Sequence, residues 1–158
     1  MNQNQSKYFD QDGNIDTANP AGDLKLMQVA TSTYADAGIL TSSTFDTGSP
    51  STFYSLTFNP GAQPPQTGTD SAKFQFASAT TTSPTSWNYL GPDGTSGTYY
   101  TGGVTSINAV HNSDQFFRYR VFLSSPNHNY TPSISDVAVT FASSCVPPGQ
   151  VLFSGLTN

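Results

Sequence analysis

The sequence predicts an all-β fold, an antiparallel β-sandwich of the jelly-roll type. About eight short segments alternate apolar with polar residues, and turn-forming residues separate them at regular spacing. A parallel α/β fold would need crossover helices, and no segment has an apolar period convincing enough for one. The 11 prolines agree with this prediction, because all of them fall in predicted turns or loops, where they remove no ladder hydrogen bond.

The most regular segment is F-F-R-Y-R-V-F-L at residues 116–123. Successive side chains of a strand point to opposite faces, so one face is fully apolar: Phe117, Tyr119, Val121 and Leu123. The other face carries two arginines between aromatic residues: Phe116, Arg118, Arg120 and Phe122. Two interpretations of this second face stay open. It is either a solvated surface whose arginines pair with neighbouring carboxylates or a cationic surface for an anionic or sugar ligand.

The other predicted strands are, in chain order, residues 23–30, 39–45, 53–58, 72–77, 87–90 and 134–141. Residues 23–30 also fit a short helix, and 104–110 fit either a strand or a loop. The turn D-T-G-S-P is expected to close the strand at 39–45. Residues 53–58 are expected to place Tyr54, Leu56 and Phe58 on one face. The alternation predicts a core that contains Leu26, Phe45, Phe74, Phe76, Tyr119, Val121, Leu123, Val137 and Val139.

Composition narrows the class of protein. A chain of 158 residues is about one domain. Charged residues make up only 9%, against roughly 25% in ordinary soluble proteins, and we read this as an extracellular, cell-surface composition. The net charge of −5 and the pI near 4.4 argue against nucleic acid and anionic membranes as partners. No apolar run is long enough to span a bilayer, so direct membrane insertion is not expected.

Three segments are expected along the chain. Residues 1–21 hold an acidic turn, residues 22–142 form the sandwich, and residues 143–158 form a linker and the start of a truncated following segment. The polar start lacks an export signal, so the chain is expected to be a piece of a longer protein whose further domains are its partners. Cys145 is the one cysteine, so it either pairs with another molecule or is a reactive thiol.

The acidic turn suggests a metal site. Oxygen-bearing side chains alternate there around Gly13, namely Asp10, Asp12, Asn14 and Asp16. Such a concentration of hard oxygen ligands predicts a structural Ca²⁺. The alternative is an Asx-rich turn whose side chains bind their own backbone. An EF-hand is excluded, because Ala21 stands where that loop needs a bidentate Glu.

A ligand site is predicted around the turn at 91–97, because aromatic and hydrogen-bonding residues gather there. An aromatic ring covers the apolar face of a sugar, while amide, carboxylate and guanidinium groups supply directional hydrogen bonds. The alternative is that Trp87 and one or more of the tyrosines belong to the core. The predicted ligand-binding residues are Trp87, Asn88, Tyr89, Asp93, Tyr99, Tyr100, Arg118 and Arg120.

Catalysis is not expected. The two histidines, His111 and His128, fall in predicted loops, and no nucleophile elbow, zinc motif or phosphate-binding loop accompanies them. The chain has no glutamate, so a glycosidase would need two aspartates.

Besides catalysis and sugar binding, a third hypothesis is that the chain is a structural spacer. In such a spacer Lys25 or Lys73 would form an isopeptide bond, although no motif identifies a partner for either lysine.

Several stretches together resemble a known family. They are G-I-L-T-S-S-T-F-D-T-G-S at 38–49, G-P-D-G-T-S-G-T-Y-Y-T at 91–101, F-F-R-Y-R-V-F-L-S-S at 116–125 and T-P-S-I-S-D-V-A-V-T-F at 131–141. They resemble the galactose-binding-like (discoidin-type) jelly-roll modules of large bacterial surface proteins, some of them pilin-like. D-G-N-I-D-T at 12–17 resembles the loop that carries a structural calcium in such modules, with Asn19-Pro20 where an aromatic residue usually follows.

The expected function combines these points. The resemblance implies a non-catalytic extracellular module of a larger bacterial surface or pilus-like protein, adhesive or glycan-binding. Its partners would be a glycan or a host or neighbouring surface protein. The alternative is a purely structural stalk spacer or a fibre or pilin-like subunit without a ligand site.

Overall fold

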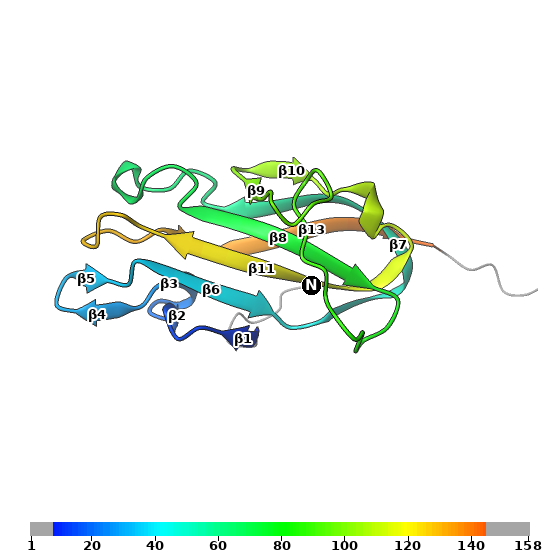
Figure 1. The fold of residues 1–158 in the computed structure, drawn as a ribbon, viewed down its shortest axis with the longest axis horizontal. Coiled ribbons are helices and arrows are strands. Elements are labelled where there is room, and N and C mark those ends of the chain that lie inside the picture. The colour runs from blue at the N-terminus through cyan, green and yellow to red at the C-terminus, as the bar shows by residue number, and fades with distance from the viewer. Residues whose placement is uncertain (1–7, 145–158) are drawn as a thin grey trace, which may run out of the picture.

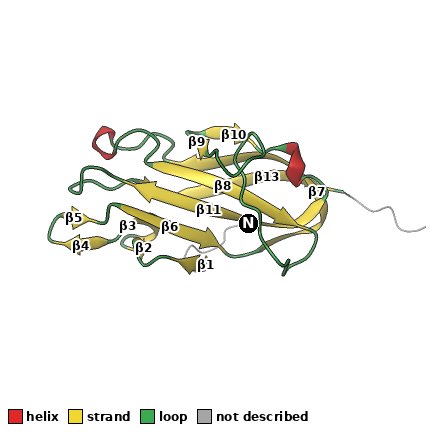
Figure 2. Cartoon of the chain, in the orientation of Figure 1, coloured by secondary structure: helices red, strands yellow, loops and turns green. Residues whose placement is uncertain are grey.

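The computed structural model describes residues 8–144, and these fold as an antiparallel β-sandwich with almost no helix (Figures 1 and 2). The predicted all-β fold is therefore confirmed. The strands are β1 Tyr8–Gln11, β2 Ile15–Ala18, β3 Ala21–Leu26, β4 Gln28–Ala30, β5 Thr33–Tyr34, β6 Ala37–Ser42, β7 Phe45–Asn59, β8 Ala72–Ala79, β9 Tyr100–Thr101, β10 Val104–Ser106, β11 Asp114–Ser124, β12 Ser133–Ile134 and β13 Asp136–Ser143. Two short 3₁₀ turns, η1 Pro65–Thr67 and η2 Ala109–His111, are added to these. Within residues 8–144, no helix has the length and apolar character needed to cross a bilayer.

β11 is the central strand of the front layer. It pairs antiparallel with β6 along one edge and with β8 along the other, and Figure 1 shows these three strands side by side across the molecule. β1 continues the layer beyond β6, and β9 continues it beyond β8. The alternation of the β11 sequence turns Val121 and Leu123 inward, where both are buried. The apolar inner face predicted for this strand is confirmed.

β7 joins the two layers because it bends part-way along. Its first residues pair with β11, whereas residues from Ser51 onward pair with β13, and β10 lies on the other edge. The bend is at D-T-G-S-P, where Asp46 Oδ1 accepts a hydrogen bond of 2.7 Å from the Gly48 N–H. Gly48 has a φ of 86°, which glycine adopts without steric cost. The prediction that the strand at 39–45 ends at this turn is therefore wrong, because the turn lies inside β7, which is 15 residues long.

A β-bulge in β7 corrects another prediction. Thr140 of β13 pairs with Ser55 and Phe141 pairs with Phe53, so Tyr54 is an extra residue without a direct partner. An extra residue resets the alternation of the strand. Phe53, Leu56 and Phe58 are buried, whereas Tyr54 is 52% exposed. Tyr54 therefore does not share a face with Leu56 and Phe58.

A small sheet of β2, β3 and β12 completes the back of the sandwich. Its apolar side chains, Ile15, Leu24, Leu26 and Ile134, join the same buried cluster as the front layer. β1 and β2 are thus integral parts of the sandwich, so the predicted boundary at residue 22 lies inside the domain. The predicted strand at 23–30 breaks at Met27 into β3 and β4, and its helical alternative is wrong.

The predicted core divides into two groups. Leu26, Phe74, Phe76, Val121 and Leu123 are at most 1% exposed. The other four, Phe45, Tyr119, Val137 and Val139, are half-buried and pack against the edge of the core. These four line a hollow between the layers, described below. The predicted linker beyond residue 144, with Cys145, lies outside the described residues.

Candidate ligand-binding site

The outer face of the front layer is built by strand register. Residues paired directly across neighbouring strands point to the same face. Arg120 of β11 stands opposite Thr41 of β6 and Gln75 of β8, and Arg118 stands opposite Ala77. The two arginines are therefore neighbours on the outer face, with the methyl group of Ala77 leaving room beside Arg118.

The segment after β8 returns along the edge of that strand that faces away from β11. Its one β-bridge joins Leu90 to Phe76, through hydrogen bonds of 2.9 and 3.0 Å, so the predicted strand at 87–90 is reduced to this contact. An extended chain turns residues two apart to the same side. Trp87 and Tyr89 accordingly lie over the outer face, while Asn88 between them is exposed.

Aromatic rings stack on the basic side chains of this face. The Arg118 guanidinium lies between two rings, 3.8 Å from the centroid of Phe9 and 4.7 Å from that of Trp87. Arg120 lies 3.9 Å from the Tyr89 centroid. Farther along, the Lys73 ammonium lies 4.2 Å from the Tyr99 ring, which meets Phe122 edge-on. Such contacts attract a cation to the face of a ring.

Hydrogen bonds fix one end of each guanidinium. Arg118 Nε donates to Thr44 Oγ1 at 2.8 Å, and Arg120 Nε donates to Thr41 Oγ1 at 3.3 Å. In the part of the chain that the structure describes, neither arginine has a carboxylate within 4.0 Å, because the one ion pair found there joins His128 to Asp36. The interpretation that these arginines pair with neighbouring carboxylates is therefore wrong for residues 8–144.

A groove runs beside the stacked rings. Its volume is about 410 Å³, and its walls are Phe9, Trp87, Tyr89, the two arginines and the hydroxyl-rich residues 82–86, with Asp10 and Thr41 also contributing. A neighbouring hollow of about 440 Å³ continues past Tyr89 to Asn88 and Ser96. The structure thus brings five predicted residues together: Trp87, Asn88, Tyr89, Arg118 and Arg120.

Asp93 has a structural role in the adjacent turn. Its exposed carboxylate accepts hydrogen bonds from the Thr95 N–H at 2.8 Å and from the Thr98 hydroxyl. The Thr98 bond and then the Thr95 bond lower the pKa of Asp93 below its usual value. A Cβ on Gly91 would lie 2.3 Å from the Thr98 carbonyl carbon, so the turn closes only with glycine there. Gln75 then ties the turn to the outer face through Nε2, which donates to the Ser96 and Thr98 carbonyls.

Tyr99 and Tyr100 take opposite directions, as neighbours in an extended chain must. Tyr99 is half-buried on the outer face. Tyr100 is fully buried in the core, and its hydroxyl accepts a hydrogen bond of 3.3 Å from the Asn108 N–H. Tyr100 therefore has no surface to offer a ligand and is removed from the candidate site. Burial raises the pKa of Tyr100, with the charge of Asp93 adding to the effect.

The carboxylates of the acidic turn accept hydrogen bonds from backbone N–H groups. Asp12 accepts hydrogen bonds of 2.9 Å from the Asn14 and Ile39 N–H groups, and Asp16 accepts one of 2.8 Å from the Ala18 N–H. The bonds from Asn14 and Ala18, each two residues along the chain, are those of the Asx-turn alternative, whereas the bond from Ile39 ties the turn to β6. Within residues 8–144, no three acidic, histidine or cysteine side chains are grouped as a metal site requires. Asp10 lines the outer groove instead, and calcium at this turn stays a prediction.

Ser78, His111 and Asp114 meet at the end of β8, but not in the order of a catalytic triad. The Ser78 hydroxyl lies 2.6 Å from Asp114 Oδ2 and 2.9 Å from His111 Nδ1. Because its single proton goes to the nearer carboxylate, Nδ1 is the donor and Nε2 carries no proton. In a triad the imidazole takes the serine proton and the carboxylate binds the imidazole. His111 Nε2 is buried and has no partner among residues 8–144, and burial lowers the pKa of His111 to about 4, against the opposing charge of Asp114.

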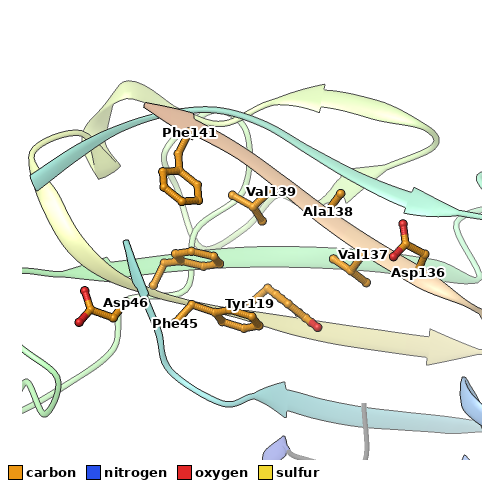
Figure 3. A pocket seen from close by; sticks show the side chains of 9 residues that line it. Phe45, Asp46, Tyr119, Asp136, Val137, Ala138, Val139 and Phe141 are labelled. Carbon is orange, nitrogen blue, oxygen red and sulfur yellow. The ribbon is translucent and has the colours of Figure 1, made fainter. Parts of the chain in front are cut away.

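A second hollow lies on the inner side of β11, below the edge strand β13 (Figure 3). Its volume is about 340 Å³. Figure 3 shows the aromatic rings of Phe45 and Tyr119 facing Val137, Val139 and Phe141 across this cleft, with the carboxylates of Asp46 and Asp136 at its two ends. Burial, and then the charge of Asp136, raises the pKa of Tyr119 to about 12.

No family model and no curated protein matches the sequence. One similar solved structure is chitosan-binding module 1, derived from a chitosanase/glucanase of Paenibacillus sp. IK-5. It has 15% sequence identity and a TM-score of 0.42, over 88% of this chain and 99% of that one. So distant a likeness identifies no family and assigns no residue a role, and the resemblance to galactose-binding-like modules stays a prediction.

Two parts of the groove were missed at the level of sequence. Phe9 stands in a short polar segment, and only the pairing of β1 with β6 carries it to Arg118. The hydroxyl-rich residues 82–86 form one wall of the groove, and none of them is among the predicted ligand-binding residues. The sequence signal for Phe9 was the pair Tyr8-Phe9, two aromatic residues before an acidic turn.

Proposed function

We propose that this protein is a non-catalytic carbohydrate-binding module that holds its saccharide in the outer groove. One observation carries the proposal. Trp87 and Tyr89 come from one segment and Arg118 and Arg120 from another, and their rings and guanidinium groups stack in pairs beside a single groove.

The chemistry of the groove suits a sugar. Arg118 and Arg120 each lie over a ring of this pair, and Trp87 and Tyr89 are only half-buried and line the groove, so we expect part of each ring to meet the apolar face of a pyranose. The hydroxyl groups of residues 82–86 and of Thr41 supply directional hydrogen bonds to sugar hydroxyls. The volume of about 410 Å³ lies in the range of about 300–1,000 Å³ that is usual for ligand sites.

The wider setting is part of the same proposal. The low content of charged residues, 9%, supports an extracellular, cell-surface location. We propose that the chain is an adhesive or glycan-presenting module of a larger bacterial surface or pilus-like protein, with a glycan or a neighbouring surface protein as partner.

A glycan array tests the proposal with two matched variants. Trp87→Ala removes a ring at the groove, and Tyr54→Ala removes a ring that is exposed elsewhere, on β7. We expect wild type and Tyr54→Ala to bind the same glycans, and Trp87→Ala to lose roughly tenfold or more in affinity, as loss of a stacked aromatic residue usually costs. Binding that survives Trp87→Ala would place the ligand elsewhere. Failure of folded wild type to bind any glycan would favour the stalk-spacer alternative.

A further inference from the structure

We propose that the saccharide bound in the outer groove is acidic, and that the terminal nitrogens of Arg118 and Arg120 bind its oxyanion, a uronate carboxylate or a sulfate ester. This inference rests on the proposed function and names the ligand class of the same site.

The first observation is the set of free donors. A guanidinium has five N–H donors in a planar fork. Both arginines use Nε on a threonine of the neighbouring segment, and among residues 8–144 their terminal nitrogens have no hydrogen-bond acceptor. None of these nitrogens is both fully buried and unpartnered, because His111 Nε2 is the one side-chain atom of that kind in this range. Since both arginines line the groove, their free donors are available to a ligand there.

The second observation is the burial of an unpaired charge. Arg118 is only 8% exposed, and a charged side chain so deeply buried is usually paired with an opposite charge. Phe9 and Trp87 attract the cation through their ring faces but accept no strong hydrogen bonds. An oxyanion in the groove would supply both the missing charge and the missing acceptors, in the bidentate geometry that arginine favours.

The third observation is the distribution of charge. The chain has five basic residues and a net charge of −5, yet Lys73, Arg118 and Arg120 all lie on this outer face. Arg118 and Arg120 are two residues apart on one strand, so their Cα atoms are separated by about 7 Å. Asp10 is the one carboxylate of the groove wall, and it forms no ion pair with them within residues 8–144. A basic patch on an acidic protein attracts anions and repels cations.

Calorimetry with charge-matched oligosaccharides tests the proposal. The probes are trigalacturonate, the same trimer as its methyl ester, a sulfated trisaccharide of neutral sugars with its unsulfated parent, and triglucosamine. We expect an acidic probe to bind and its neutral counterpart to bind roughly tenfold more weakly or worse, because hydrogen bonds to charged groups are the strong ones. Binding should also weaken several-fold between about 50 and about 500 mM sodium chloride.

Point variants test which side chains bind the oxyanion of the saccharide. Arg120→Gln should weaken the acidic probe roughly tenfold and the neutral one little, and Arg118→Lys should do the same because lysine keeps the charge but lacks the fork. Asp10→Asn should tighten acidic binding. Lys25→Gln on β3 removes an equal charge far from this face and should leave affinity unchanged. Thermal melts identify any variant that has not folded, and Arg120→Gln serves where the more buried Arg118 does not tolerate substitution.

The outcomes separate the two proposals. Binding of the uronate and not the sulfated probe, or the reverse, identifies the oxyanion and supports the inference. Equal binding of an acidic probe and its neutral counterpart, still dependent on Trp87, would overturn the inference and leave the carbohydrate-binding function standing. Preference for triglucosamine would also overturn the inference. Failure of the folded protein to bind any saccharide, of whatever charge, would overturn both.

Discussion

The two hollows beside β11 lie on opposite faces of the same strand and differ in kind. On the outer face, rings lie flat on guanidinium groups that keep free donors, and hydroxyl groups form the wall. On the inner face, rings and valines meet one another, and carboxylates stand only at the ends of the cleft. An aromatic lining is common to both, so the number of aromatic residues does not identify a sugar site. What distinguishes the outer groove from the inner cleft is the set of unpaired polar groups beside its rings.

The inner cleft follows from the architecture rather than from a ligand. β13 is paired only with β7 among the described strands, so nothing in residues 8–144 closes the layer beyond it. Val137, Val139 and Phe141 therefore remain half-buried at an open edge. The outer groove, in contrast, is built from four separate parts of the chain: residues 9–10, Thr41 of β6, residues 82–89 and β11.

The largest expected difference is between the core, which His111 contacts through the Phe76 ring, and the outer face, in their response to pH. An unfolded histidine titrates near pH 6.5, whereas His111 in the folded protein titrates near pH 4. Between these values the unfolded state binds more protons, so the free energy of unfolding falls as the pH is lowered through this window. The total loss is about 3 kcal/mol. Saccharide binding on the outer face should not follow this titration, because arginine stays charged throughout.

Denaturant titrations from pH 7.5 to pH 4 measure this effect. His111→Gln should flatten the pH dependence relative to wild type. His128→Gln is the control, because it replaces the other histidine of the chain, whose side chain is 48% exposed. An unchanged slope in His111→Gln would mean that carboxylates, and not this histidine, set the acid response.

Truncation of valines compares the closed core with the open cleft. Val121 is fully buried, so Val121→Ala should cost about 1–3 kcal/mol in the free energy of unfolding. Val139→Ala, at the half-open cleft, should cost well under about 1 kcal/mol by the same area argument. Urea denaturation of both variants checks this. Equal costs would show that the cleft closes in solution.

Filling the cleft should have a smaller effect of the opposite sign. Val139→Leu adds apolar contact in a hollow of about 340 Å³ and is expected to stabilise the fold by about 0.5–1 kcal/mol. The affinity for saccharide should stay as in wild type, because the outer groove is on the other side of the sheet. A loss of binding in this folded variant would place the ligand in the cleft instead.

Calcium is expected to give the smallest effect. If Asp10, Asp12, Asn14 and Asp16 hold a weak structural ion, calcium at its dissociation constant stabilises the fold by only RT ln 2, about 0.4 kcal/mol. Denaturant titrations in about 5 mM calcium and in chelator measure it, with Asp16→Asn as the variant and Asp23→Asn as the control outside the group. Superimposable curves in the two buffers would reject a stabilising site.

The sequence predicted what depends on local alternation. The two faces of β11 and the burial of Phe74 and Phe76 both follow from the period of two in an extended chain. The same rule contradicts one predicted pair of ligand-binding residues. Tyr99 and Tyr100 are adjacent, so they cannot both face a ligand from one strand.

The sequence did not predict what depends on pairing between distant segments. The bulge at Tyr54 exists only in register with β13, and the position of Phe9 exists only through the pairing of β1 with β6. The chain has ten acidic residues, which made ion pairs with the arginines a reasonable expectation. Which carboxylates come near is a tertiary property, and among the described residues none comes within 4.0 Å of Arg118 or Arg120.

Trp87 is the one tryptophan of the chain, and its indole lies 4.7 Å from the guanidinium of Arg118. All indole fluorescence of the protein therefore originates at the wall of the groove. A ligand that enters the groove would change the solvent contact and the quenching of this single fluorophore, so its emission wavelength and intensity report occupancy without a label. The core, with its phenylalanines and Tyr100, is silent when excitation is confined to the long-wavelength band that only the indole absorbs. Detachment of residues 82–89 from the sheet could thus be observed separately from unfolding of the sandwich.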